Sequence, residues 1–469
     1  MLFNSIEYFT FFLLTLFIHS IIKNTVNLRF IFLLAASYFF YFFNNGNIII
    51  LLLISTLIDY IAGIVIDKYS DRPVIKKISL MFSLIGNLGM LGFFKYYNFF
   101  CDNASFLFSI FGYKISLHYT NVILPVGISF YTFQTLSYTI DVYRGNLKVE
   151  KNFIKFAFYV TYFPQLIAGP IVRASEFIPQ LYHKAKITNE DINFALYKIA
   201  NGLLKKIIFA DSIAFYADKA FNNPAGIDSI TALIGVYSFA FQIYFDFSGY
   251  SDIAIGCAKL MGFNIPDNFN NPYMSTSLTD FWRRWHISLS TWLKDYLYIT
   301  LGGNRMKTKA GVYRNLMITM LLGGLWHGAN WTFIVWGGIQ GLALSIEKFF
   351  NLYEFKKTKF TILTRKFLVF HLVCFSWIIF RAASLRDAVL YCKSFLNFDL
   401  YRIFTYGEIF ALSIIVIGFI MQFLSERFSF RKRFLNLNIF IQSFIYAIIV
   451  CLILIFSNNL DHSFIYFQF

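Results

Sequence analysis

The chain has 469 residues, of which 58% are hydrophobic and only 14% are charged, and its net charge at pH 7 is +16. A soluble domain carries about 25% charged residues, so this composition, with a mean hydropathy of +0.59, excludes an ordinary soluble protein and indicates an integral membrane protein. The basic residues fall in short runs between apolar segments, as in the cytoplasmic loops of polytopic proteins, and we therefore expect no nucleic-acid partner.

Apolar windows separated by charged or turn-forming loops predict a series of membrane spans. They lie at 8–22, 30–43, 48–66, 78–96, 124–145, 153–170, 229–262, 315–350, 367–381, 406–424 and 438–457. Polar residues at 246–252 predict a turn or a kink within the window 229–262. The aromatic segment 97–120 and the amphipathic region 187–221 are predicted to be interfacial. We therefore expect one all-α polytopic domain over 1–469, with about ten to twelve transmembrane helices and a lipid bilayer around it.

The distribution of basic residues orients these spans. A basic loop at 427–433 separates the last two windows and is predicted to be cytoplasmic, and Lys23 and Arg29 place the first loop on the same side. The C-terminal tail, 458–469, contains neither lysine nor arginine and is then predicted to be extracytoplasmic. Met1–Thr10 lacks the basic region and cleavage site of a signal peptide, so the first window is predicted to be a retained span.

The stretch 315–350 has the sequence Gly-Gly-Leu-Trp-His-Gly-Ala-Asn-Trp at its centre, with His327 in an apolar setting. A buried imidazole is costly in a bilayer unless it has a function or a partner, so two interpretations stay open: a functional histidine, or one satisfied by a neighbouring carbonyl or tryptophan. Glycines four residues apart, Gly324 with Gly328 and Gly337 with Gly341, predict close helix packing. A straight helix of this length would be about 50 Å long, so a break or tilt near 327–330 is expected.

A second notable stretch, 279–296, contains two arginines, three tryptophans and His286. Thr279 or Asp280 is a natural N-cap and Gly302-Gly303 a natural stop. Aromatic and aliphatic residues recur at helical spacing and form one face: Phe281, Trp285, Leu289, Trp292 and Tyr296. From the pattern alone this is an interfacial helix anchored by tryptophans, with arginines that are solvated or meet lipid phosphates.

Several ordered segments together resemble the membrane-bound O-acyltransferase family. The segments that carry the resemblance are 124–134, 162–173, 244–252, 281–289, 298–305 and 323–329. They are most similar to the branch that contains the membrane subunits for alginate and peptidoglycan O-acetylation and the D-alanyl transferase of teichoic acids. The resemblance implies helices around a tunnel that crosses the membrane, with interfacial and re-entrant helices. It also implies that His327 is the catalytic histidine and His286 the second motif histidine.

The chemistry of imidazole suits the role that the resemblance gives to His327. A neutral imidazole can take a proton from an attacking hydroxyl because its usual pKa of about 6.5 lies near working pH. In such proteins the acyl group enters as a cytoplasmic thioester, here expected to be acetyl-coenzyme A as a substrate rather than a bound cofactor, and leaves on the outer side. His286 is expected to position groups or serve the thioester side.

The chain ends with the aromatic run Phe-Ile-Tyr-Phe-Gln-Phe at 464–469. Exposed aromatic patches usually mark a binding surface or a segment that inserts, and an interfacial anchor is the alternative. The ending resembles a C-terminal aromatic motif of the same branch whose tyrosine is thought to carry the acyl group. That tyrosine corresponds to Tyr466, and a phenol is a suitable relay because phenolate leaves an ester more readily than an alkoxide does.

No metal site is predicted. The five cysteines form no C-x-x-C pair; they are Cys101, Cys257, Cys374, Cys392 and Cys451. Asp246 and Asp252 lack a nearby histidine and are expected to accept hydrogen bonds from local backbone groups or to line the tunnel. Arg173, Lys205 and Lys206 could attract the phosphates of coenzyme A, or they could be solvated loop charges.

The expected function is O-acetylation of an extracytoplasmic polysaccharide. Peptidoglycan is the preferred acceptor, followed by alginate or another exopolysaccharide. The expected location is the inner membrane of a bacterium. Because no soluble domain with a serine hydrolase motif is present, the last transfer is expected to need an extracytoplasmic acetyltransferase partner protein. Two alternatives remain: D-alanyl transfer from a carrier protein to teichoic acid, and a secondary transporter or flippase, which would favour inverted repeats and paired charges within spans.

Overall fold

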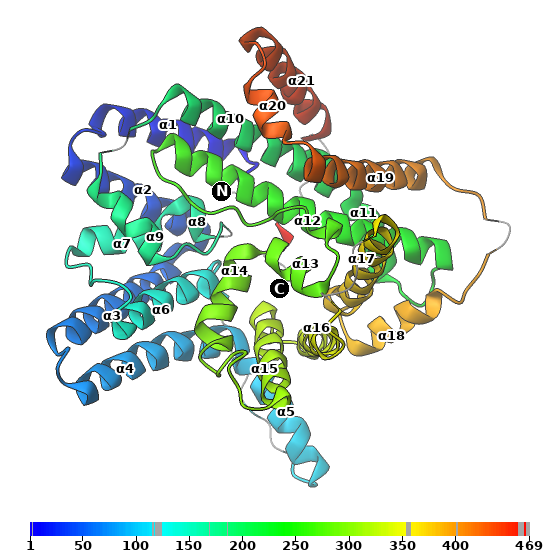
Figure 1. The fold of residues 1–469 in the computed structure, drawn as a ribbon, viewed down its shortest axis with the longest axis horizontal. Helices are drawn as coiled ribbons and strands as arrows, with labels where there is room; N and C mark the ends of the chain where they lie inside the picture. The colour runs from blue at the N-terminus through cyan, green and yellow to red at the C-terminus, as the bar shows by residue number, and fades with distance from the viewer. Residues whose placement is uncertain are drawn as a thin grey trace. The chain divides into compact units, whose positions relative to one another are not determined.

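The structure is a computed structural model that describes residues 1–469 except 2, 115–116, 118–123, 168, 185, 353–357, 400–401, 458–463 and 466–469. The described residues form α-helices with short 3₁₀ and π-helical turns, and no strand occurs among them (Figure 1). This confirms the all-α prediction. Contacts group the residues into two compact units: 1–192 with 257–266, and 193–256 with 267–469.

The first unit is built from short and medium helices around a buried polar centre. Its helices are α1 (Ile6–Ile22), α2 (Val26–Asn45), α3 (Ile49–Lys68), α4 (Pro73–Leu91), α5 (Tyr97–Ile110), α6 (Ile128–Arg144), α7 (Phe153–Thr161), α8 (Phe163–Leu166), α9 (Ala174–Phe177) and the start of α10 (Asn189–Leu203). Asp59 on α3 is fully buried and accepts hydrogen bonds from Asn87 on α4 at 2.8 Å and Thr139 on α6 at 2.7 Å. Donors from both neighbours compensate the desolvation of this carboxylate and hold the three helices together.

One predicted span in this unit is wrong. The window 153–170 was expected to be continuous, but α7 ends at Thr161 and the four-residue α8 begins at Phe163. Pro164 lies in the first turn of α8, where its missing N–H would have had no helical partner in any case. The same proline would have interrupted a helix running through it, because its ring clashes with the preceding turn.

The second unit holds a large aromatic core. Its helices are the rest of α10, α11 (Asp211–Asn222), most of α12 (Ser229–Leu260), α13 (Leu278–Arg284), α14 (Ile287–Trp292), α15 (Lys309–His327), α16 (Trp331–Phe349), α17 (Lys359–Arg381), α18 (Leu385–Ser394), α19 (Tyr406–Arg427), α20 (Phe430–Leu435) and α21 (Ile439–Ser457). Trp377 stacks on Trp336 at 5.7 Å between ring centroids and lies 5.2 Å from Trp285. These indoles join the C-terminal end of α13 to α16 and α17.

Helix α12 runs without interruption for 32 residues, so the turn predicted at 246–252 does not occur. The carboxylates of this segment are satisfied by lysines from α10 and the π-helical turn after it, and the backbone therefore has no need to open. Gly249 lets α12 pack closely against α10, because a Cβ at this position would lie 2.7 Å from the carbonyl oxygen of Gly202.

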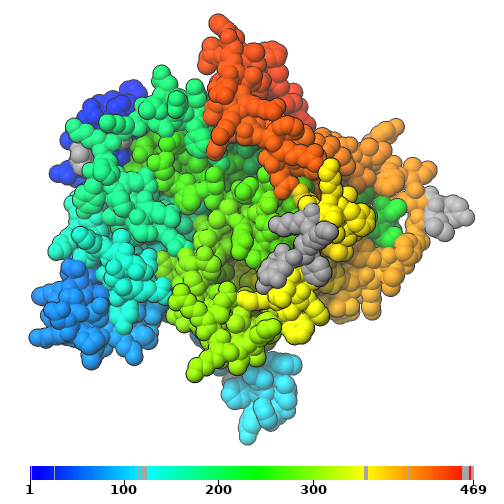
Figure 2. Space-filling model, in the orientation of Figure 1, coloured from blue at the N-terminus to red at the C-terminus, as the bar shows by residue number. Residues whose placement is uncertain are grey.

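Six helical segments of the described residues are long and apolar enough to cross a membrane, and Ile6–Ile22 is a shorter apolar helix. Two of the six segments, Asn27–Lys68 and Pro73–Ile110, each contain two of the labelled α-helices, which accounts for part of the higher number expected from sequence. The chain is thus a multi-pass membrane protein. The last segment, Ile439–Phe456, is only 6% buried, and Figure 2 shows α20 and α21 standing out from the helices beneath them.

Candidate active site

The stretch around His327 folds into a tight helical hairpin. Helix α15 ends at His327, and α16 begins at Trp331 after Asn330, whose side chain caps it by accepting from the N–H of Thr332 at 3.0 Å. This confirms the predicted break at 327–330. A Cβ on Gly324 would lie 2.2 Å from the carbonyl oxygen of Phe333, and one on Gly337 would lie 2.3 Å from that of Met320. The predicted close approach at these glycines is therefore confirmed.

A Gly337→Ala substitution is expected to destabilise this hairpin by about 1–3 kcal/mol, because the methyl group must push apart two backbones that touch. Its matched control is Gly338→Ala, since a Cβ at the next position of the same helix meets only the side chain of Leu321 at 3.5 Å, an ordinary contact. The check is the thermal unfolding temperature of both purified variants. Equal temperatures would contradict the close contact between Gly337 and the backbone of α15.

Aromatic rings from three helices surround His327, which is 7% exposed. Its ring centroid lies 5.3 Å from that of Trp336 and 5.1 Å from that of Phe380, both nearly perpendicular, and 5.0 Å from that of Trp326. Such edge-to-face packing fixes the plane of the imidazole, so its nitrogens point in defined directions.

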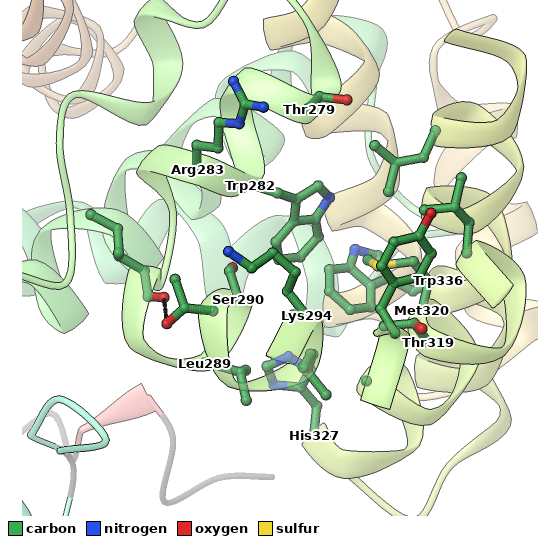
Figure 3. A pocket seen from close by; sticks show the side chains of 17 residues that line it. Thr279, Trp282, Arg283, Leu289, Ser290, Lys294, Thr319, Met320, His327 and Trp336 are labelled. Carbon is green, nitrogen blue, oxygen red and sulfur yellow. Dashed lines mark hydrogen bonds between the residues drawn. The ribbon is translucent and has the colours of Figure 1, made fainter. Parts of the chain in front are cut away.

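A cavity of about 360 Å³ reaches His327 (Figure 3). Its lining residues come from α13 to α16: Thr279, Trp282, Arg283, Ile287, Leu289, Ser290, Thr291, Leu293, Lys294, Tyr298, Leu316, Thr319, Met320, Gly323, His327, Trp336 and Leu344. Arg283 and Lys294 are exposed, whereas His327 is buried, so the cavity connects a cationic rim with an apolar interior. An apolar pocket with a few convergent polar groups is the usual form of a small-molecule site.

His286 interrupts the helix that the sequence predicted over 279–296. Helix α13 ends at Arg284 and α14 starts at Ile287, with His286 between them in the left-handed region at φ 43°. The predicted N-cap is also wrong, because Ser277 caps α13 by accepting from the N–H of Asp280 at 3.0 Å. The apolar periodicity continued through the break, so it gave no signal that the backbone changes direction.

Asn268 sets the protonation of His286. The Oδ1 atom of Asn268 accepts from the N–H of Ser288 at 3.1 Å, which fixes the amide orientation, and it lies 3.2 Å from Nδ1 of His286. Nδ1 must then carry the proton, and Nε2 is the basic nitrogen. Burial lowers the pKa of His286 to about 3, so this ring stays neutral at physiological pH.

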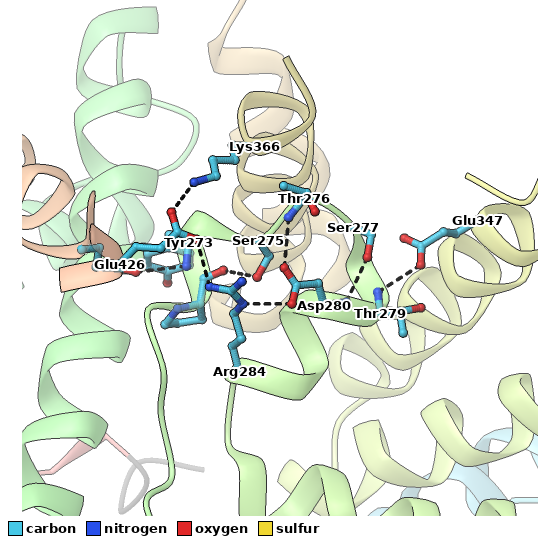
Figure 4. Close-up of polar contacts among 12 residues, drawn as sticks. Tyr273, Ser275, Thr276, Ser277, Thr279, Asp280, Arg284, Glu347, Lys366 and Glu426 are labelled. Carbon is cyan, nitrogen blue, oxygen red and sulfur yellow. Dashed lines mark hydrogen bonds and ion pairs between the residues drawn. The ribbon is translucent and has the colours of Figure 1, made fainter. Parts of the chain in front are cut away.

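Charged residues that could not be recognised from the sequence hold α13, the helix that carries Arg283 (Figure 4). Glu347 on α16 accepts from the N–H groups of Leu278 at 2.6 Å and Thr279 at 3.2 Å, where a carboxylate meets the positive end of α13. Arg284 pairs with Asp280 at 2.9 Å and with Glu426 on α19 at 3.3 Å. A single glutamate near the end of an apolar helix offered little to distinguish it from an interfacial charge.

Both motif histidines lie near the indole ring of Trp326. The ring of Trp326 lies 5.0 Å from that of His327 and 6.2 Å from that of His286, so the second unit brings both to the same place. They differ in access, because His327 lines the cavity and His286 is not among its lining residues. Tyr466, the third predicted site residue, lies outside the described residues. Phe464 and Ile465 are described, and each is 1% exposed.

The lysines considered for coenzyme A are engaged elsewhere, which corrects that expectation. Lys205 pairs with Asp252 at 2.7 Å, and Lys206 pairs with Asp211 at 2.8 Å and with Asp246 at 2.9 Å. The pairs with Asp252 and Asp246 join α12 to the amphipathic region, so the lysines are not solvated loop charges and these two aspartates do not serve local backbone donors alone. Among the described residues, no three histidine, cysteine or acidic side chains gather as a metal site would require.

Comparison with known proteins supports the resemblance. The model of the membrane-bound O-acyltransferase family matches residues 146–385, just over half of the chain. A protein of Azotobacter vinelandii named "probable alginate O-acetylase" is 44% identical over 335 residues, 71% of this chain and 66% of that protein. A peptidoglycan O-acetyltransferase of Helicobacter pylori is 39% identical over 352 residues, 69% of this chain and 66% of that protein. A teichoic acid D-alanyltransferase of Bacillus subtilis is 30% identical over 280 residues, 55% of this chain and 69% of that protein.

The matched segment contains the centre of the site. It includes both motif histidines and every residue that lines the cavity. The chain spans 66% of the length of each O-acetylating relative named above. With the helical architecture and the motif histidines at one indole, the match over 146–385 identifies the chain as a member of the membrane-bound O-acyltransferase family.

Proposed function

We propose that this protein is a membrane O-acetyltransferase that passes acetyl groups from cytoplasmic acetyl-coenzyme A to the hydroxyl groups of an extracytoplasmic polysaccharide. The observation that carries the proposal is the cavity that joins the exposed cations Arg283 and Lys294 to the buried His327. Such a cavity suits a substrate with a phosphate-bearing head and a small acyl end, because the cations attract phosphates and the apolar interior excludes water around the thioester.

His327 acts as the general base and Tyr466 as the acyl relay in this proposal. The imidazole takes the phenol proton while the phenolic oxygen forms a bond to the thioester carbonyl carbon; the carbon–sulfur bond then breaks, and the leaving thiolate receives the proton as free coenzyme A. A sugar hydroxyl or a partner's nucleophile next attacks the carbonyl carbon of the acetyl-tyrosine ester. The ester bond to the phenolic oxygen breaks, and this oxygen takes the proton of the attacking group, which restores the phenol. Both steps balance without any further reactant.

His286 has a different role from His327. Its Nδ1 lies 3.2 Å from Oδ1 of Asn268 and its ring packs at 4.6 Å on Phe247, so the orientation of the imidazole is fixed. A neutral ring of fixed orientation can orient neighbouring groups, but it does not serve as a cation for phosphate. We assign it a positioning role.

The relatives support acetyl transfer more than D-alanyl transfer. The alginate O-acetylase and peptidoglycan O-acetyltransferase relatives are 44% and 39% identical to this chain, against 30% for the teichoic acid D-alanyltransferase. Their names include two polysaccharides, so the proposed acceptor class is a polysaccharide hydroxyl, with an extracytoplasmic acetyltransferase as the partner that completes transfer. The proposed location is the cytoplasmic membrane of a bacterium.

Mass spectrometry of the C-terminal peptide tests the proposal. After incubation of the purified protein with ¹³C-labelled acetyl-coenzyme A, we expect one acetyl group on Tyr466, and none on the peptide from a Tyr466→Phe variant. Acetyl turnover without this adduct would remove the relay and favour direct transfer at His327. Labelling only from a D-alanyl carrier protein would contradict the acetyl donor, and saccharide transport without acyl turnover would contradict the enzyme.

A further inference from the structure

The last described residues of the chain occupy a built site on the middle of α12. The N–H of Ile465 donates to Oδ2 of Asp246 at 2.8 Å, and both side chains are almost completely buried. The Phe464 ring lies 4.5 Å from that of Tyr250 and 5.8 Å from that of Phe247. The hydrogen-bond acceptor Asp246 and the aromatic rings of Phe247 and Tyr250 thus lie within about one turn of the same helix. Ile465 and Phe464 contact them.

The charges behind Asp246 explain why this site takes a backbone N–H. Oδ1 of Asp246 pairs with Nζ of Lys206 at 2.9 Å, and the same ammonium pairs with Asp211 at 2.8 Å. Two carboxylates share one cation, and all three side chains are at most 4% exposed. A buried carboxylate is stable only when donors surround it, and Ile465 supplies a donor to the oxygen that faces away from Lys206.

The backbone around Lys206 is shaped to reach Asp246. Lys206 lies in the π-helical turn Leu204–Ala210, a wide turn of the kind that often marks functional positions. A Cβ on Gly249 would lie 3.1 Å from the N atom of Lys206, so this turn packs directly on α12. The lysine is therefore held in place by helix packing, independently of the terminal segment.

We propose that Asp246, held by Lys206, is a positioning residue that docks the chain's own C-terminal segment beside the second motif histidine. Phe247, which packs on Phe464, also packs edge-to-face on His286 at 4.6 Å. The anchored residue, Ile465, directly precedes Tyr466 in the sequence. The docking itself stands on these contacts, and its value for acyl transfer rests on the proposed function.

The test removes the anchoring N–H without touching the charged groups. Ile465→Pro lacks the donor, while the control Ile465→Val keeps it together with a similar side chain. Chymotrypsin that cuts after Tyr466 must bind the residues before that bond, so a docked segment has to leave its site first. In the full-length protein, we expect wild type and Ile465→Val to resist this cleavage and Ile465→Pro to be cut at least about tenfold faster, at an unchanged unfolding temperature.

Cleavage of Ile465→Pro at the wild-type rate would overturn the proposal, as would cleavage of wild type at the rate of detergent-denatured protein. Acetylation of Tyr466, measured on the same samples, reports the relay separately. Protection with no acetyl adduct in wild type would leave the docking in place and remove the relay. An adduct that is lost in Ile465→Pro and kept in Ile465→Val would support both.

Discussion

Replacing His327 with alanine is expected to reduce acetyl transfer by about 10²- to 10⁴-fold, the range that loss of a positioned general base produces. The other ionisable residues that line the cavity are Arg283, Lys294 and Tyr298. Burial raises the pKa of the Tyr298 phenol, and arginine and lysine side chains offer hydrogen-bond donors but no acceptor, so none of the three can replace the imidazole as a base. The rings around His327 orient it but accept no proton.

A matched control separates the base from its packing. Phe380→Leu removes a ring that lies 5.1 Å from His327 and keeps the imidazole, so it is expected to retain activity within about tenfold of wild type. The measurement is the release of coenzyme A together with the unfolding temperature of each variant. Added imidazole should restore part of the activity to His327→Ala, because the deleted side chain leaves space in the cavity wall. Wild-type turnover in His327→Ala would contradict the assignment.

Features that depend on local spacing could be predicted from the sequence. The glycines at 324 and 337 predicted backbone contact, and the length of 315–350 predicted the break after His327, because both follow from helix geometry alone. The all-α architecture followed from hydropathy. The family resemblance supplied the proposed roles of the two motif histidines, and the structure places both rings near Trp326.

Features that depend on partners distant in the sequence could not be predicted in the same way. The polar segment 246–252 suggested a break in α12, since nothing local shows that Lys205 and Lys206 would neutralise its aspartates from another helix. The only available signal was that both regions carry opposite charges in an apolar setting. Likewise, the turn at His286 is stabilised by Asn268, whose Oδ1 accepts from Ser288 at 3.1 Å beyond the turn. Periodicity does not report such contacts.

Lys206→Met is expected to lower the free energy of unfolding by about 3–5 kcal/mol, because it leaves Asp211 and Asp246 buried without their shared cation. Burial alone would lower the pKa of Lys206, but the neighbouring carboxylates of Asp246 and Asp211 raise this pKa above its usual value. The wild-type lysine is therefore charged. The control is Lys205→Met. Its partner Asp252 keeps Lys198 and Asn201, each at 2.7 Å, so a much smaller loss is expected.

Unfolding of the variants in mixed micelles, followed by tryptophan fluorescence, measures both losses, and equal losses would contradict the network. A triple variant, Lys206→Met with Asp211→Leu and Asp246→Leu, is expected to regain most of the stability, because apolar residues often replace a buried ion network at little cost. The same variant lacks the acceptor for Ile465 and should expose the C-terminal segment to chymotrypsin. This variant would then be stable but undocked. The stability of α12 requires only that the charge of Asp246 is neutralised or removed, whereas docking of Ile465 requires the carboxylate oxygen of Asp246 as an acceptor.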